Sequence, residues 1–264
     1  MTVTDRGTLR ATQVVPNGGY RFIPSVFQFS GGVAAEPGYR FERVVFRTPV
    51  PLGDGLDFVA RRLSDLGRPT TAVCAFELRS PGQFSEAEFT TFNREYAGIL
   101  NKWGLMDGDV NPVARTNVCP AAPRPLVPSV QAFVYTVADD DADGADFVTA
   151  GGAETPEGAS DYRQGIVRLG DTSLEGLREK LAFVRDEQTI RLHSLGHDWH
   201  SASEVNAYCL HDVGPLLYDE LIARGASAMH EGVTVLKASP PVADCDFEMD
   251  VRNISSTLAV DGLS

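Results

Sequence analysis

The sequence predicts an α+β protein made of two tandem units, each a β-sheet with two helices packed on one face. Three observations support this prediction. Strand-like and helix-like segments of the first half follow the order β-β-α-β-α-β-β. An acidic run of small residues, ADDDADGA, then occupies 138–145 and is typical of a linker. The second half repeats a similar order of segments, which indicates a duplication.

The first unit spans residues 1–140, and its segments are identified by the spacing of their apolar residues. Apolar residues three or four apart indicate helices, whereas β-branched and aromatic runs indicate strands. Leu56, Val59 and Leu63 share one helical face, and Gly67 ends that helix. The predicted strands lie at 20–29, 39–46, 70–78, 115–118 and 129–137, the first two pairing as a hairpin.

The central stretch of this unit is the helix that starts at Ser85 and the strand that follows it. Ser85 and Glu88 form a capping box. Four apolar residues share one face of the helix: Phe89, Phe92, Tyr96 and Leu100. The next strand is polar and carries one arginine, Arg115. A lone arginine there indicates a carboxylate partner, either a protein side chain or a ligand.

The second unit spans residues 146–264 and repeats the segment order at lower similarity. Its "DFVTAGGAE" at 146–154 matches "VFQFSGGVA" as a strand that ends in two glycines. Helices are expected within 172–195 and at 213–223. Strands are expected at 201–210, 232–241 and 245–254. In this alignment His230 takes the place of Arg115.

Composition excludes several classes of function. The net charge is −13, with 36 acidic against 23 basic residues, which disfavours nucleic-acid binding. No apolar run reaches the roughly 18 residues of a membrane span, and no signal peptide is evident, so a cytoplasmic location is expected. The chain has four scattered cysteines: Cys74, Cys119, Cys209 and Cys245. Their scattered positions indicate reduced thiols. Phosphate-binding loops, dinucleotide fingerprints and serine-hydrolase elbows are absent from the sequence.

The central stretch resembles the reactive intermediate deaminase (RidA) family. "FNREYAGIL" followed by "NPVARTNV" is similar to that family's Asn-x-x-Tyr helix and Pro-Ala-Arg strand. "TTAVCAFELRSPGQFSEAEF" resembles its strand-loop-helix, and "FQFSGG" its opening strand. The resemblance implies chorismate-mutase-like units that assemble around clefts, here a trimer of two-unit chains. It also implies hydrolysis of a 2-imine or 2-enamine carboxylate to a 2-oxo acid and ammonia, without metal or organic cofactor. A two-unit chain favours the 2-aminomuconate type.

The resemblance assigns roles to four residues of the first unit. Arg115 would hold the carboxylate of a small substrate; the alternative is a salt bridge in a subunit contact. Asn93 and Tyr96 match the helix motif and would contact the substrate, although Tyr96 could equally be a packed core residue. Gly31 would let the backbone approach the ligand, and it could also be a turn glycine.

The acid that handles the water is the main departure from the family. The expected glutamate on the last strand is Gln131 in the first unit, whereas the second unit has Asp250 and Glu248 there. Because His230 replaces the arginine in the second unit, neither unit has a full set. A composite site that joins Arg115 with Asp250 or Glu248 would restore it. The alternative is a second unit with a structural role.

Other polar residues carry weaker predictions. A distal carboxylate would need a second positive group, for which Arg124, Arg47 and His230 are candidates by charge. Three histidines have a spacing that resembles that of zinc ligands: His193, His197 and His200. Gly196 interrupts the helix between them, so no metal site is predicted. Cys119 is expected to be a buried thiol. Two further functions remain open, a chorismatase-like enzyme on the same architecture and a non-catalytic ligand-binding module.

Overall fold

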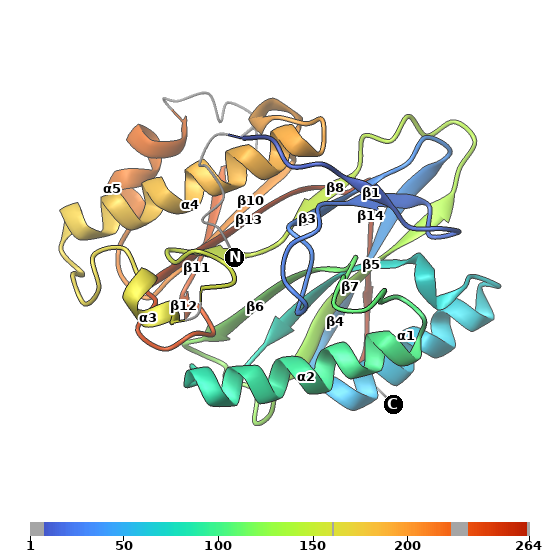
Figure 1. Ribbon diagram of the computed structural model, residues 1–264, viewed down its shortest axis with the longest axis horizontal. Coiled ribbons are helices and arrows are strands. Elements are labelled where there is room, and N and C mark those ends of the chain that lie inside the picture. Colours follow the sequence, from blue (N-terminus) through green and yellow to red (C-terminus); the bar gives the residue numbers. More distant parts are fainter. Residues whose placement is uncertain (1–7, 160, 223–231, 263–264) are drawn as a thin grey trace.

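The computed structural model describes residues 8–159, 161–222 and 232–262 of the chain. In these ranges two β-sheets lie face to face, and helices cover the outer face of each sheet (Figure 1). Helices α1 (Leu52–Asp65) and α2 (Glu86–Lys102) pack on one sheet, and α4 (Leu174–Ser194) and α5 (Gly214–Leu217) pack on the other. This four-layer arrangement confirms the predicted α+β class with two helices on one face of each sheet.

The first sheet contains six strands in the described part of the chain. Its central strands come from the first half, and its two edge strands come from the second half. Strand β5 pairs in parallel with β6 and antiparallel with β7. The spatial order is β12 (Ala238–Ser239), β6 (Ala114–Pro120), β5 (Val73–Arg79), β7 (Ser129–Ala138), β4 (Tyr39–Pro51) and β14 (Ser256–Val260).

The second sheet also mixes the two halves, because two N-terminal strands and β3 extend it. Strand β3 pairs antiparallel with β8, and β8 pairs with β13. Short strand β9 (Gly152–Ala153) also pairs with β13. The spatial order is β1 (Gln13–Val14), β2 (Tyr20–Phe22), β3 (Gly32–Ala35), β8 (Phe147–Thr149), β13 (Phe247–Asn253), β10 (Glu204–Cys209) and β11 (Val233–Leu236).

Four of the described helices overlap the predicted helical segments, whereas the short helix α3 (Tyr162–Gly165) was not predicted. Helix α2 begins after Ser85, whose side chain accepts from Glu88 N–H while Glu88 accepts from Ser85 N–H, so the predicted capping box is confirmed. None of the described helices combines the length and apolar character that a membrane crossing requires. The helices are α1 (Leu52–Asp65), α2 (Glu86–Lys102), α3 (Tyr162–Gly165), α4 (Leu174–Ser194) and α5 (Gly214–Leu217), which continues as a π-helical turn (Tyr218–Ile222).

The predicted hairpin between 20–29 and 39–46 is wrong. Strand β2 pairs with β3 in the second sheet, whereas β4 pairs with β7 and β14 in the first sheet. The chain changes sheets at a turn in which Gly38 has a positive φ of 86°. Strand β3 (Gly32–Ala35) is buried at all four positions, so it lacks the alternation that marks a half-exposed strand.

The space between the sheets holds a small-residue core and a buried ionic network. Alanines, valines and a few aromatic rings from both sheets form the core, among them Val33, Ala75 and Val148. Beside it Arg252 of the second sheet pairs with Glu77 of the first sheet. The two halves therefore share both sheets and one interior. The boundary between units 1–140 and 146–264 stays a prediction.

Candidate active site

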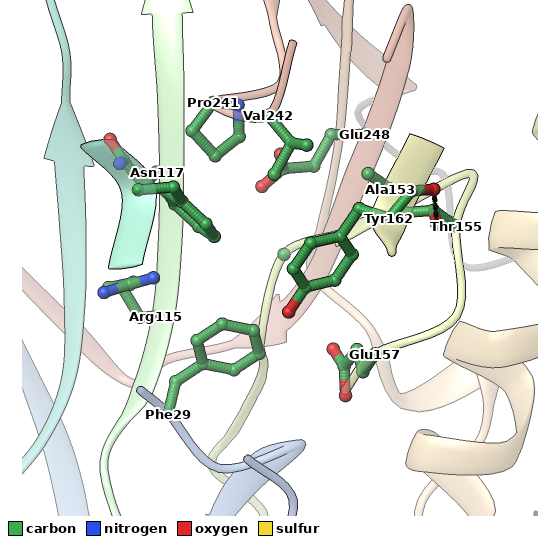
Figure 2. A pocket seen from close by; sticks show the side chains of 12 residues that line it. Phe29, Arg115, Asn117, Ala153, Thr155, Glu157, Tyr162, Pro241, Val242 and Glu248 are labelled. Carbon is green, nitrogen blue, oxygen red and sulfur yellow. Dashed lines mark hydrogen bonds between the residues drawn. The ribbon is translucent and has the colours of Figure 1, made fainter. Parts of the chain in front are cut away.

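A cavity opens where β6 of the first sheet faces β13 and β9 of the second sheet. Figure 2 shows Arg115 and Asn117 on one wall, with Glu248 and Tyr162 across from them. Phe29 and several other apolar side chains complete the lining. Both halves of the chain contribute to this cavity, so one chain builds it in the described residues.

Arg115 lies in an aromatic cage. The residue is 3% exposed, and its Cζ is 5.0 Å from the ring centroids of both Phe29 and Tyr96, with Phe92 and Phe89 at 5.6 and 5.8 Å. Within the described ranges the guanidinium forms no ion pair, and its Nη1 is buried without a hydrogen-bond partner. Burial lowers its pKa to about 10, so it stays charged at neutral pH. A buried cation without a counter-ion suits a ligand carboxylate.

Glu248 is the acid that shares the cavity with Arg115. It is 4% exposed, and no hydrogen bond or ion pair engages its carboxyl group among the residues that the structure describes. Burial and then the nearby Asp250 charge raise its pKa well above the usual glutamate range, and Arg115 opposes that shift. The raised pKa favours the protonated carboxyl, which can donate a proton to a bound ligand.

Gly151 allows Glu248 to reach this position. Its N–H donates to the Arg115 carbonyl oxygen at 3.0 Å, so it lies directly against the strand that carries the cation. A Cβ atom at this position would overlap with Glu248 Oε1. The absence of a side chain at Gly151 is thus a requirement of the site. The family resemblance assigns this role to Gly31, which is the counterpart of Gly151 in the first half.

We expect Gly151→Ala to lower kcat/KM by about 100-fold, because a displacement of about 1 Å in a reacting group has an effect of that size. The overlap is with the movable end of a side chain, so the melting temperature should change little. Gly31→Ala is the matched control, since its added Cβ would meet Ile23 outside the cavity lining. Steady-state kinetics and thermal unfolding of both variants measure the effect. Equal activities of the two variants would contradict this role for Gly151.

Four polar residues of the lining lie outside the prediction: Asn117, Thr155, Glu157 and Tyr162. Asn117 is two residues beyond Arg115 on β6, and this spacing could have indicated a shared face. Tyr162 begins α3, and burial raises the pKa of its hydroxyl. Glu157 accepts from Ser25 Oγ at 2.7 Å and pairs with Arg191. No local pattern could have placed the last two beside the central strand.

Asp250, the other predicted acid, lies elsewhere. It is fully buried, and its carboxylate accepts hydrogen bonds from four residues. The donors are Thr116 (2.9 Å), Tyr208 (2.7 Å), Asn206 (3.0 Å) and Arg252 (2.9 Å). Asp250 is not part of the cavity lining. Because all its acceptor capacity is engaged in the network between the sheets, the geometry corrects the expectation that it could face the substrate.

The remaining substrate-binding predictions of the first half also lie behind the lining. Tyr96 contributes its ring to the Arg115 cage, and its hydroxyl is buried without a partner. Asn93 is fully buried, and neither of its amide atoms has a partner in the described residues. Gly31 is held by two backbone hydrogen bonds, its N–H donating to Ile23 O and its carbonyl accepting from Ala150 N–H. These three residues support the cavity wall but do not line it.

His230 lies outside the described residues. The other candidate cations for a second carboxylate do not reach the cavity. Arg47 pairs with Asp261 at the surface, and Arg124 is exposed and donates to Ala121 O.

The predicted histidine and cysteine roles can be placed as well. His197 stacks on Phe147 at 4.5 Å, beyond the end of α4. Over the described ranges, no three histidine, cysteine or acidic side chains are grouped so that they could hold a metal ion. Burial raises the pKa of the Cys119 thiol to about 12, so it is a buried neutral thiol at neutral pH.

The fold and the cavity define a protein of two packed sheets with a cavity built from both halves and lined by a buried arginine and a buried glutamate. The chain belongs to the 2-aminomuconate deaminase CnbZ family, whose model matches residues 12–258. It is 46% identical over 236 residues to 2-amino-5-chloromuconate deaminase of Comamonas testosteroni. The aligned region covers 89% of this chain and 93% of that protein. The predicted 2-aminomuconate deaminase type is thereby confirmed at the level of the family.

The solved structures that match this chain are more distant in sequence. A chorismatase crystal structure matches 84% of this chain and 77% of its own, with 14% identity and a TM-score of 0.47. The YjgF gene product of E. coli matches 43% of this chain and 84% of its own, with 13% identity and a TM-score of 0.32.

Proposed function

We propose that this protein is a deaminase that hydrolyses a 2-aminomuconate-like 2-enamine or 2-imine carboxylate to the 2-oxo acid and ammonia. The observation that carries the proposal is the pair in the cavity: a buried Arg115 cation that has no ion-pair partner among the described residues, and a Glu248 carboxyl of raised pKa. Family membership and the 46% identical deaminase support the same reaction.

The two side chains divide the chemistry between them. Arg115 binds the carboxylate next to the reacting carbon, and the aromatic cage excludes water from this ion pair. In the imine tautomer, Glu248 gives its proton to the nitrogen and then, as a carboxylate, takes one from the attacking water. A C–O bond forms at the imine carbon and the C–N bond breaks. The imino acid and one water thus become the oxo acid and one ammonia.

The proposal includes no metal or organic cofactor, because orientation and one proton donor suffice for hydrolysis of an imine. The chorismatase-like alternative is not favoured, since the family model and the curated relative are both deaminases. The trimer of two-unit chains and the cytoplasmic location stay predictions. Size-exclusion chromatography with light scattering would test the assembly.

The test is ammonia release from 2-aminomuconate generated in the cuvette. Ammonia would be measured with a coupled enzyme, and the oxo acid by chromatography. We expect both products to form in equal amounts and well above the spontaneous rate. Release at the spontaneous rate would contradict the proposal and would favour a non-catalytic binding module. Pyruvate release from chorismate, assayed in parallel, would instead favour the chorismatase-like alternative.

A further inference from the structure

Asn117 is a second polar group on the wall that carries Arg115. The two residues are two positions apart on β6, so their side chains leave the same face of the strand. Both residues are 3% exposed, and both line the cavity (Figure 2). Asn117 thus shares the burial and the direction of the carboxylate-binding arginine.

A hydrogen bond from Ser80 fixes the orientation of the Asn117 amide. Ser80 Oγ donates to Asn117 Oδ1 at 3.0 Å, so the amide oxygen is turned toward β5. Asn117 Nδ2 has no hydrogen-bond partner among the described residues and is shielded from solvent. A buried donor without an acceptor is unfavourable. A ligand oxygen in the cavity would offset this cost.

The neighbouring arginines are already engaged. Arg79 donates to Leu78 O and lies 3.7 Å from Glu77, while Arg191 pairs with Glu157 and Glu187. A second acid group of a ligand would therefore meet the neutral Asn117 amide rather than another free cation of the described cavity. Two positions along a strand correspond to roughly 7 Å, which is comparable to the separation of the carboxylates in an extended six-carbon diacid.

We propose that Asn117 is a specificity-determining residue that binds the distal carboxylate of the substrate through Nδ2–H, while Arg115 binds the carboxylate beside the C–N bond. This inference rests on the proposed function, because it assumes that the carboxylate next to the reacting carbon lies on Arg115. It makes Ser80 a positioning residue, since the Ser80 hydroxyl holds the amide with its donor toward the cavity.

The test compares two unreactive ligands that differ only in the second carboxylate. Hexa-2,4-dienedioate has both acid groups, and hexa-2,4-dienoate has one. Calorimetry would measure the Kd of each ligand for the wild type, Asn117→Leu, Ser80→Ala and Tyr162→Phe. The control is Asn253→Leu, whose site lies on β13 outside the cavity lining. Leucine matches the size of asparagine but lacks the donor, and thermal unfolding checks the fold of each variant.

We expect the wild type to bind the dienedioate more tightly than the dienoate. Asn117→Leu should weaken dienedioate binding about 10- to 100-fold, the effect of losing a hydrogen bond to a charged group, and should change dienoate binding less than about threefold. Ser80→Ala should reduce the same preference in part. Asn253→Leu should leave both constants unchanged.

Three results would overturn the inference: equal affinity of the wild type for both ligands, equal weakening of both by Asn117→Leu, or loss of the preference in Tyr162→Phe but not in Asn117→Leu. These outcomes are separate from failure of the proposed function. If the wild type releases ammonia from 2-aminomuconate while Asn117→Leu keeps the ligand preference, the deaminase assignment stands and only the role of Asn117 fails.

Discussion

Replacing Arg115 with methionine is expected to lower kcat/KM for 2-aminomuconate by about 100- to 1,000-fold, the effect of removing one preorganised electrostatic group from an active site. Methionine fills the aromatic cage with a side chain of similar length but no charge. Arg115→Lys keeps the charge and loses the planar fork, so its activity should lie between that of the wild type and that of the methionine variant.

Stability separates this effect from misfolding. Arg115 is a buried cation without a counter-ion in the described residues, and replacing a buried charge with a packed apolar side chain is often neutral or stabilising. Arg115→Met should therefore unfold at or above the wild-type temperature while it loses activity. Arg47→Ala, which changes a surface arginine paired with Asp261, serves as the control and should keep full activity. Wild-type kcat/KM in Arg115→Met would remove the arginine from the mechanism.

Glu248→Gln is expected to lower kcat by about 100- to 10,000-fold with little change in KM, because it removes a proton donor but keeps the shape of the side chain. The wild-type rate should fall as pH rises through the raised pKa of Glu248, since the protonated form starts the reaction. The residual rate of Glu248→Gln should lack that decline. Glu95→Gln, on the exposed face of α2, is the matched control and should show the wild-type profile.

The same substitution should alter the pH dependence of stability. The pKa of Glu248 is higher in the folded than in the unfolded state, so the folded state retains a proton that the unfolded state releases above about pH 4.3. The stability from this proton is complete below that pH and declines as pH rises toward the folded-state pKa. Glu248→Gln has no titrating carboxyl at this position, so its stability does not depend on this proton. Its free energy of unfolding relative to that of the wild type should therefore increase with pH. Urea unfolding at several pH values measures this, and a constant difference would exclude a raised pKa.

The elements with strong local signals could be predicted from the sequence. The Ser85 capping box and the apolar face of α2 are formed by residues three and four positions apart, so the helix can be predicted from local sequence. Arg115 was identified for a related reason, because a lone arginine in a polar strand is conspicuous. Strand β3 was missed, since Gly32–Ala35 is short and buried on both faces. Its pairing with β8 depends on a segment more than a hundred residues away.

By itself the sequence determined the α+β class and the central helix and strand, and it singled out Arg115 as the candidate cation and Glu248 and Asp250 as the candidate acids. Only the tertiary structure distinguished the two acids, because it places Glu248 in the cavity lining and Asp250 outside it. Their side chains lie two positions apart and therefore leave the same face of β13. This spacing predicts the shared face, but it does not predict which residues of other segments each side chain contacts. Asp250 meets four hydrogen-bond donors between the sheets, whereas Glu248 lies against Gly151, where the absence of a side chain leaves room for its carboxyl group. Those neighbours come from distant parts of the chain, so they became visible only once both sheets were assembled.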